Sequence, residues 1–319
     1  MTTYLLLGLG LILLTVGGDT LVRGASTAAR SLGVSPLLIG LTLVGFSTST
    51  PELVTSLAAA AAGSPGIAVG NVVGSNTANI LLILGLTALI APIAVDHAAF
   101  RRDGLVLVVA SLVCLAAVLS TLVDRLWGAA MLALLVAYLV WAYLGERKAQ
   151  HAERAKYEHI AEDAPDARGG LWVGLGLAVL GIGLTIGGAH LLVENAILVA
   201  RRFGVSDTLI GLTVVAVGTS LPELVTSVVA ALRRHADVAL GNIIGSNIYN
   251  VLGILGITAL VSPIRVPAEI ARLDIWVMLA ATALLVLFVR SGMKIVRWEG
   301  AALLAAYGAY LWWLTRDLL

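Results

Sequence analysis

The sequence predicts an all-α membrane protein with ten transmembrane helices, arranged as two inverted-topology repeats of five helices each. Three observations lead to this prediction. The 319 residues are 59% hydrophobic and only 12% charged, a balance that excludes an ordinary soluble globule. Residues 33–95 align without a gap with residues 204–266, and 36 of the 63 aligned positions are identical. A single long polar segment, residues 145–170, separates the two halves.

The apolar runs place the spans in order along the chain. About 20 apolar residues cross the hydrocarbon core of a bilayer. Runs of about this length lie at residues 3–22, 35–62, 67–91, 104–120, 126–144, 171–200, 206–232, 238–262, 273–290 and 299–315. We therefore expect a first repeat over residues 1–144, a cytoplasmic linker over residues 145–170 and a second repeat over residues 171–319.

The number of spans in each half determines how the halves are oriented. Five is an odd number, so the second repeat enters the membrane from the side opposite to the first. With the N-terminus outside, 14 of the 20 Lys and Arg residues lie on the cytoplasmic side, as the positive-inside rule requires. We expect a multi-pass protein of the cell inner (plasma) membrane with both termini extracytoplasmic. A net charge of +1 offers no basic surface for a nucleic acid, and the sequence leaves the oligomeric state open.

Each duplicated segment carries a glutamate near the middle of a predicted span. Counted at about 1.5 Å per residue, Glu52 lies roughly 16 Å from the end of its span, near the centre of a core about 30 Å thick. Glu223 occupies the same position in the second copy. Both glutamates end a Ser-x-Pro-Glu string, which has the spacing of a capping box with proline in the first turn, so we expect a helix break at each. Inversion brings the two glutamates face to face at the repeat interface.

Further oxygen-bearing groups share a helical face with these glutamates. Hydroxyls precede each glutamate by three and four positions, and the next span of each repeat carries a serine and an asparagine four apart. A helix break also frees carbonyl oxygens. The candidate groups are Thr48, Ser49, Ser75, Asn79 and the Gly45 carbonyl in the first repeat, and Thr219, Ser220, Ser246, Asn250 and the Ala216 carbonyl in the second. This all-oxygen set suits the hard cations Ca²⁺ and Na⁺, and one Ca²⁺ or about two Na⁺ neutralise both carboxylates.

Several of the polar residues also have a structural interpretation. Glu52 and Glu223 could cap helices and stay neutral in the membrane, although two symmetric copies beside hydroxyls argue against that. For four further amides we favour packing and interhelical hydrogen bonds over ligation: Asn71, Asn76, Asn242 and Asn247. The charges near span ends are interpreted as interfacial charges or ion pairs: Asp19, Arg23, His190 and Glu194.

Two strings of the second copy, residues 218–224 (GTSLPEL) and 241–247 (GNIIGSN), resemble the α-repeats of the cation/Ca²⁺ exchanger superfamily, in particular prokaryotic sodium/calcium exchangers. The resemblance implies alternating access around a site built from the second, third, seventh and eighth helices. It also implies that the groups named above are the ligands and that the first and sixth helices slide. Two departures matter. Ser47 stands where the family has glycine, and Asn250 stands where potassium-dependent relatives have aspartate, so we expect no K⁺ requirement.

The duplicated glutamates and their oxygen-bearing neighbours predict a secondary antiporter that exchanges Na⁺ for Ca²⁺. The family resemblance implies that this exchange is electrogenic. No cofactor is expected, and the absence of a GxxxxGK[ST] motif argues against a nucleotide partner. No nucleophile and base pair suggests an enzyme. An H⁺/Ca²⁺ antiporter, in which protonation of Glu52 and Glu223 replaces Na⁺, is the nearest alternative. A passive cation channel is the more distant one.

Overall fold

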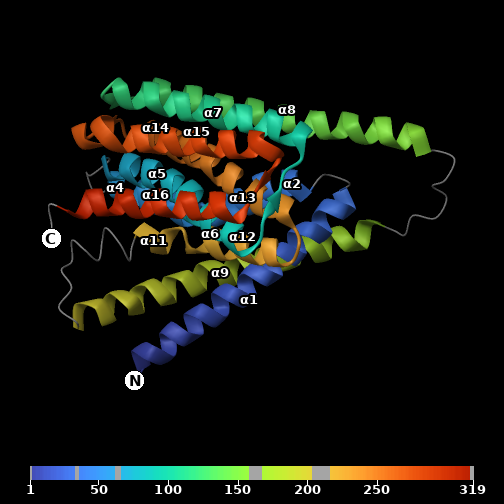
Figure 1. The fold of residues 1–319 in the computed structure, drawn as a ribbon, viewed down its shortest axis with the longest axis horizontal. Coiled ribbons are helices and arrows are strands. Elements are labelled where there is room, and N and C mark those ends of the chain that lie inside the picture. Colours follow the sequence, from blue (N-terminus) through green and yellow to red (C-terminus); the bar gives the residue numbers. More distant parts are fainter. Residues whose placement is uncertain (1, 33–35, 62–65, 158–166, 203–215, 317–319) are drawn as a thin grey trace.

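The computed structural model describes residues 2–32, 36–61, 66–157, 167–202 and 216–316, and most of them are helical (Figure 1). The helices of the first half, including two π-helical turns labelled η, are α1 (Thr2–Leu32), α2 (Pro36–Ile39), η1 (Gly40–Val44), α3 (Gly45–Thr48), α4 (Thr50–Ala61), α5 (Gly66–Ala78), η2 (Asn79–Leu84), α6 (Gly85–Ile90), α7 (His97–Leu119) and α8 (Arg125–Tyr157). Those of the second half are α9 (Ala167–Arg202), α11 (Ala216–Thr219), α12 (Leu221–Leu232), α13 (Ala236–Tyr249), η4 (Asn250–Leu255), α14 (Gly256–Val261), η5 (Ile270–Asp274), α15 (Ile275–Gly292) and α16 (Arg297–Thr315).

Seven helices in the described part of the chain are long and apolar enough to cross a membrane. They correspond to the first, third, fourth, fifth, sixth, eighth and ninth predicted spans. The second predicted span is divided into α2, η1, α3 and α4, while α16 occupies the position of the tenth. Residues 206–215 of the seventh predicted span lie outside the described residues. The protein is therefore a multi-pass helical membrane protein, and the full count of ten stays a prediction.

Two features of the fold were not specified by the sequence-based expectations. Within the polar segment predicted as a linker, α8 continues to Tyr157 and α9 begins at Ala167. Glu, Lys, Arg and Ala fill most of residues 146–156, and these are strong helix formers. The described residues also contain four strands of two residues each: β1 (Ile93–Ala94), β2 (Leu122–Val123), β3 (Ile264–Arg265) and β4 (Lys294–Ile295).

The four strands connect the two halves. β1 pairs antiparallel with β4, with Ile93 opposite Ile295, and β2 pairs antiparallel with β3, with Val123 opposite Ile264. Each small sheet therefore takes one strand from each half. This exchange satisfies the backbone groups of the connections just beyond the apolar helices, where a lone strand would leave its ladder unpaired.

The centre of the molecule is formed by the two helices that follow the broken ones. In the most apolar window of residues 236–261, 89% of positions are buried, and the corresponding value for residues 67–90 is 72%. Only 22% are buried in the most apolar windows of α8 and α9, whose outward faces carry large apolar side chains. An apolar surface of that kind is stable against lipid and not against water. The third and eighth predicted spans therefore form the protein core, and the outer helices face the bilayer.

Glycines hold α1 and α9 side by side in an antiparallel pair (Figure 1). Three glycines spaced by seven on α1 meet three glycines spaced by seven on α9: Gly10 opposite Gly188, Gly17 opposite Gly181 and Gly24 opposite Gly174. A Cβ added at any of the six would come within about 3 Å of the partner backbone, for example 2.4 Å from the Leu21 nitrogen at Gly181. Small residues of this kind let membrane helices approach closely.

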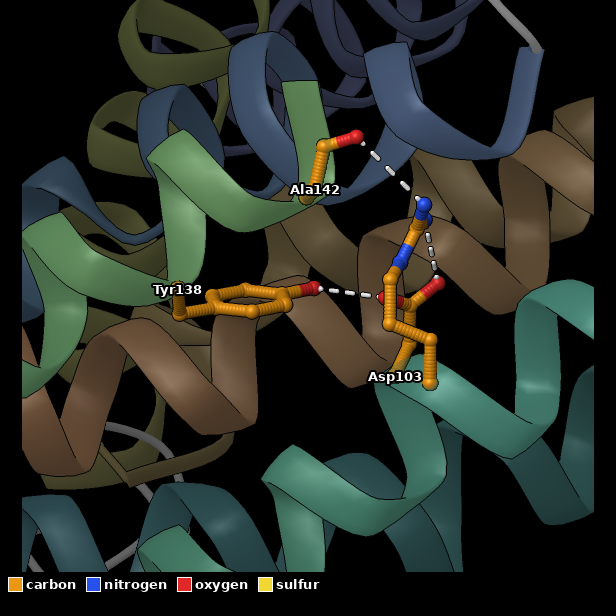
Figure 2. A network of polar contacts seen from close by, with 4 residues as sticks. Asp103, Tyr138 and Ala142 are labelled. Carbon is orange, nitrogen blue, oxygen red and sulfur yellow. Dashed lines mark hydrogen bonds and ion pairs between the residues drawn. The ribbon is translucent and has the colours of Figure 1, made fainter. Parts of the chain in front are cut away.

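An ion pair within α7, between Arg102 and Asp103, is linked to α8 by further hydrogen bonds (Figure 2). Arg102 Nε donates to Asp103 Oδ1 at 2.7 Å, and its Nη2 donates to Oδ2 at 3.0 Å. Tyr138 on α8 donates its hydroxyl to the same carboxylate at 3.1 Å, and Arg102 Nη1 reaches the Ala142 carbonyl at 3.5 Å. Asp103 is fully buried, and this bidentate arginine together with the tyrosine neutralises and solvates its charge.

Figure 1 also shows where the chain ends lie. The N-terminal end of α1 and the C-terminal end of α16 lie at one end of the molecule, whereas the end of α8 and the start of α9 lie at the other.

Candidate cation site

The broken helices position the site. A single residue interrupts each one: Ser49 between α3 and α4 with φ −83° and ψ 6°, and Ser220 between α11 and α12 with φ −91° and ψ 9°. The prolines that follow lie in the first turns of α4 and α12, where their missing N–H groups cost nothing. The predicted helix breaks are thus present in both halves.

The serines at the breaks do not cap their own helices as the capping-box spacing predicted. The Ser220 side chain makes no hydrogen bond to the first turn of α12. Its hydroxyl donates instead across the interface to Glu52 Oε1 at 3.2 Å, and the Ser49 hydroxyl donates to Glu223 Oε1 at 2.9 Å. Charge-assisted hydrogen bonds to a carboxylate are stronger than those to a neutral acceptor, so the serines tie each glutamate to the opposite half.

Asparagines from the two central helices form a second set of contacts between the halves. Asn76 Nδ2 donates to the Asn247 carbonyl at 3.1 Å, and Asn79 Nδ2 donates to Asn247 Oδ1 at 3.2 Å. Asn250 Nδ2 donates to Asn76 Oδ1 at 3.0 Å. The π-helical turns η2 and η4 begin at Asn79 and Asn250 respectively, and such turns are frequent at functional sites.

A third pair of asparagines, Asn71 and Asn242, hydrogen-bonds to the backbone of the glutamate-bearing helices. Asn71 Nδ2 donates to the Glu52 carbonyl at 3.1 Å, and Asn242 Nδ2 donates to the Glu223 carbonyl at 3.2 Å. Each also donates to a hydroxyl one turn further along, Ser56 or Ser227. The expectation that these amides serve interhelical hydrogen bonding agrees with these contacts. The sequence argument missed that Asn76 and Asn247 bridge the halves; their identity in both copies was the available signal.

Four oxygen atoms at the centre are left with no partner. Glu52 Oε2, Glu223 Oε2, Asn79 Oδ1 and Asn250 Oδ1 are buried, and no residue in the described part of the chain donates a hydrogen bond to them. They come from equivalent positions of the two halves, and both glutamates are only 1% exposed. A buried polar atom without a partner costs roughly 1–3 kcal/mol, and more when it is charged, so four together call for a ligand. The matching ligand is a hard cation, because carboxylate and amide oxygens are its preferred donors.

The remaining predicted residues lie around this centre. Thr48 is buried and donates to Asn242 Oδ1 at 3.0 Å, while Ser246 donates to the Gly45 carbonyl at 3.2 Å. Ser75 is buried on α5 and faces a cavity, and Thr219 is half-buried at the end of α11. The structure describes Ala216 only as the first residue of α11.

The charges near span ends are ion pairs, as the sequence suggested. Asp19 pairs with Arg23 at 3.0 Å and also contacts Arg233, which begins the connection between α12 and α13. His190 Nε2 lies 3.1 Å from a Glu194 carboxylate oxygen.

The two halves differ in how an outer helix meets a broken helix. α1 lies against α12, with Gly18 so close to Val225 that a Cβ there would be 2.9 Å from Val225 Cγ1. The corresponding positions, 171 residues away, are Ala189 on α9 and Val54 on α4, and both line a cavity of about 320 Å³. The two halves therefore pack differently here, closed between α1 and α12 and open between α9 and α4.

The family model described as sodium/calcium exchanger protein matches residues 2–144 and 173–316. The chain belongs to the sodium/calcium exchanger family. It is 41% identical over 304 residues to the putative antiporter CaxA of Alkalimonas amylolytica, with 94% of this chain and 95% of CaxA covered. It is 34% identical over 339 residues to the sodium/calcium exchanger MaX1 of Methanosarcina acetivorans, with 97% of each covered.

A solved structure of the sodium-calcium exchanger NCX_Mj, soaked without Na⁺ and Ca²⁺, shares the fold with a TM-score of 0.82 at 33% identity over 98% of each chain. Another, soaked with 2.5 mM Na⁺ and 0.1 mM Ca²⁺, gives a TM-score of 0.80 at 34% identity over 96% of each chain. The protein is thus a membrane transporter for cation/Ca²⁺ exchange, in a family of exchangers and not of enzymes.

Proposed function

We propose that this exchanger is a Na⁺/Ca²⁺ antiporter that binds its ions between the two halves, at the four unpartnered oxygens of Glu52, Glu223, Asn79 and Asn250. These oxygens carry the proposal because they are buried, equivalent in pairs and without a hydrogen-bond donor among the described residues. Two carboxylates supply two negative charges, which one Ca²⁺ or two Na⁺ balance. The two ions therefore compete for one site.

The other proposed ligands are the hydroxyls and carbonyls that the sequence predicts. They are Thr48, Ser49, Ser75 and the Gly45 carbonyl, with Thr219, Ser220, Ser246 and the Ala216 carbonyl from the second half. Ser49 and Ser220 already contact the carboxylates, so they can turn toward an ion without a change of backbone. The Gly45 carbonyl accepts hydrogen bonds from Ser246 at 3.2 Å, from the Ser49 N–H at 3.3 Å and from Thr48 at 3.4 Å, so it binds a cation in exchange for one of these donors.

Exchange proceeds by alternating access. Alternating access requires two states, and the structure fits one of them. In this state α1 is in close contact with α12, and a cavity lies between α9 and α4. In the other state the two outer helices exchange roles, with α9 against α4. The glycine seam between α1 and α9 lets the pair move as one body, because its contacts lie within the pair.

The proposed topology follows the sequence prediction. Ten spans form two inverted repeats, residues 1–144 and 171–319, with duplicated segments 33–95 and 204–266, around a cytoplasmic connection at residues 145–170. Both termini lie outside the inner membrane, which fits their common location at one end of the molecule.

The exchange is electrogenic and independent of K⁺. More than two Na⁺ for each Ca²⁺ moves net charge, so a membrane potential drives it. Asn250 in place of an aspartate leaves two carboxylates at the site, one fewer than a site that also neutralises K⁺ needs. We expect the same Ca²⁺ uptake with and without K⁺, and stimulation by K⁺ would contradict this proposal.

The test is ⁴⁵Ca²⁺ uptake into Na⁺-loaded proteoliposomes at fixed pH. Wild-type protein is expected to accumulate Ca²⁺ when Na⁺ is diluted outside. Glu52→Gln and Glu223→Gln should each lose at least about 90% of the uptake rate, because a single carboxylate leaves one positive charge of the bound Ca²⁺ unbalanced. Glu194→Gln is the matched control, since its carboxylate is exposed and pairs with a histidine.

Two outcomes would contradict the proposed function. Normal uptake by both Glu52→Gln and Glu223→Gln would show that the proposed site is wrong. Uptake that follows a pH gradient and ignores the Na⁺ gradient would replace Na⁺ by protons as the coupled ion, and uptake that never exceeds equilibrium would indicate a channel.

A further inference from the structure

The two halves carry equivalent aspartates outside the central site, and these differ in charge balance. Asp103 begins the fourth predicted span, and Asp274, 171 positions later, ends η5 at the start of the ninth. Each accepts a hydrogen bond from a tyrosine of the following span: Tyr138 at 3.1 Å and Tyr310 at 2.9 Å.

One substitution between the copies changes what these aspartates can do. Arg102, which neutralises Asp103, is replaced at the corresponding position by Leu273. Asp103 is fully buried against its arginine (Figure 2). In the described part of the chain, the hydrogen bond from Tyr310 is the one polar contact of Asp274, and no cation lies within ion-pair distance of it.

The uncompensated aspartate lines a cavity that reaches the proposed ion site. The cavity has a volume of about 430 Å³, and its polar lining includes Asp274, Tyr307, Tyr310, Asn71, Ser75 and Thr219. Asn71 holds the Glu52 carbonyl, and Ser75 and Thr219 are proposed ligands. The lining also includes Leu314, in the last turn of α16.

From this geometry we infer that Asp274 is an entry site for cations, above all for divalent ones, on the membrane face where the termini lie. The inference rests on the proposed function. A single negative charge beside a polar cavity raises the local cation concentration, and its effect depends on the charge of the ion. The equivalent Asp103 cannot act in this way, because Arg102 cancels its field. The two faces of the exchanger therefore differ in their attraction for Ca²⁺.

The test compares initial rates at the two faces of oriented proteoliposomes. Asp274→Asn is expected to raise the apparent KM for Ca²⁺ about three- to tenfold at the face bearing the termini and to leave the maximal rate unchanged. The apparent KM for Na⁺ should rise only by about the square root of that factor, since the ion carries half the charge. The difference should shrink when ionic strength rises from about 0.01 to 0.15 M, where the Debye length falls from about 30 to about 8 Å.

A second variant transfers the first half's arrangement to the second. Leu273→Arg places a guanidinium beside Asp274 and is expected to raise the apparent KM as Asp274→Asn does, although the carboxylate is still present. Leu273→Met is the size-matched neutral control. Glu269→Gln removes an exposed acid five positions earlier, which lies outside the cavity lining but interacts electrostatically with Asp274, and it should raise the apparent KM by less than Asp274→Asn does.

Three results would overturn the inference and leave the proposed function intact. They are an unchanged apparent KM in Asp274→Asn, an equal shift of the apparent KM for Na⁺ and Ca²⁺, and an equal shift at both faces. Wild-type protein that exchanges nothing would overturn the proposed function instead. In that case Tb³⁺, which also takes oxygen ligands, decides the entry site. Emission excited through tyrosine should be lost in Asp274→Asn and kept in Glu52→Gln, and equal emission from both overturns it.

Discussion

The clearest difference between the two copies of the break is Ser47 in the first and Gly218 in the second, and it gives a prediction about packing. A Cβ added at Gly218 would lie 2.3 Å from Val193 Cγ2 on α9. Non-bonded carbon atoms are stable at about 3.5–4.0 Å, so the overlap exceeds about 1 Å. Valine in a helix strongly prefers one rotamer, so Val193 cannot turn away without cost. We expect Gly218→Ser to destabilise the protein by about 1–3 kcal/mol and to slow exchange, because α9 is displaced from α11.

The double variant Gly218→Ser with Val193→Ala separates this clash from other effects. Removing both Cγ atoms leaves the Val193 Cβ 3.4 Å from the new atom, an ordinary contact. We expect the second change to restore most of the stability, with a coupling energy of about 1–2 kcal/mol in the cycle. Thermal unfolding in detergent and Na⁺-driven ⁴⁵Ca²⁺ uptake measure the two effects. A Gly218→Ser variant as stable as the wild type, or no restoration by Val193→Ala, would refute the reasoning.

Three further predictions concern contacts described above. Ser49→Ala and Ser220→Ala each remove a hydrogen bond to a buried carboxylate, which is worth about 1.5–3 kcal/mol. Calorimetry should show that each variant binds Ca²⁺ at least about tenfold more weakly, to a similar extent in both. Weaker binding in one variant alone would contradict the paired role. Asp103→Ala removes the carboxylate that pairs with the partly buried Arg102 and should destabilise the fold by up to about 3 kcal/mol, visible as a lower unfolding temperature. Unchanged stability would mean that the pair is dispensable. Gly17→Leu pushes α1 away from α9, because the added side chain meets the α9 backbone, and it should abolish exchange even in folded protein recovered by size-exclusion chromatography. Full exchange activity would exclude a tight α1–α9 unit.

Much of this arrangement could be predicted from the sequence because both copies of the repeat carry the same signal. The apolar runs located the long helices, but three of them continue beyond the apolar run: α1 to Leu32, α7 back to His97 and α8 to Tyr157. The Ser-x-Pro-Glu strings located the breaks, since proline fits the first turn of a helix and not its interior.

The side-chain partners could not be predicted in the same way. Sequence spacing says which groups share a helical face, but not which face meets which across the interface. For that reason the hydrogen bonds from Ser49 and Ser220 to the glutamates of the opposite half were not predicted. The different surroundings of Asp103 and Asp274 depend on one arginine and on tyrosines in later spans, and neither aspartate lies in the duplicated segments.

The exchanged strands set a limit on the order in which the chain can fold. β1 is complete when Ala94 has been made, but its partner β4 begins only at Lys294, about 200 residues later. At a synthesis rate of about 5–20 residues per second, β1 waits roughly 10–40 s for β4, and β2 waits about 140 residues, or roughly 7–28 s, for β3. During that interval Glu52 also lacks the serine of the other half, so the site and the ends of the helices are completed together, late, and only when both halves are present.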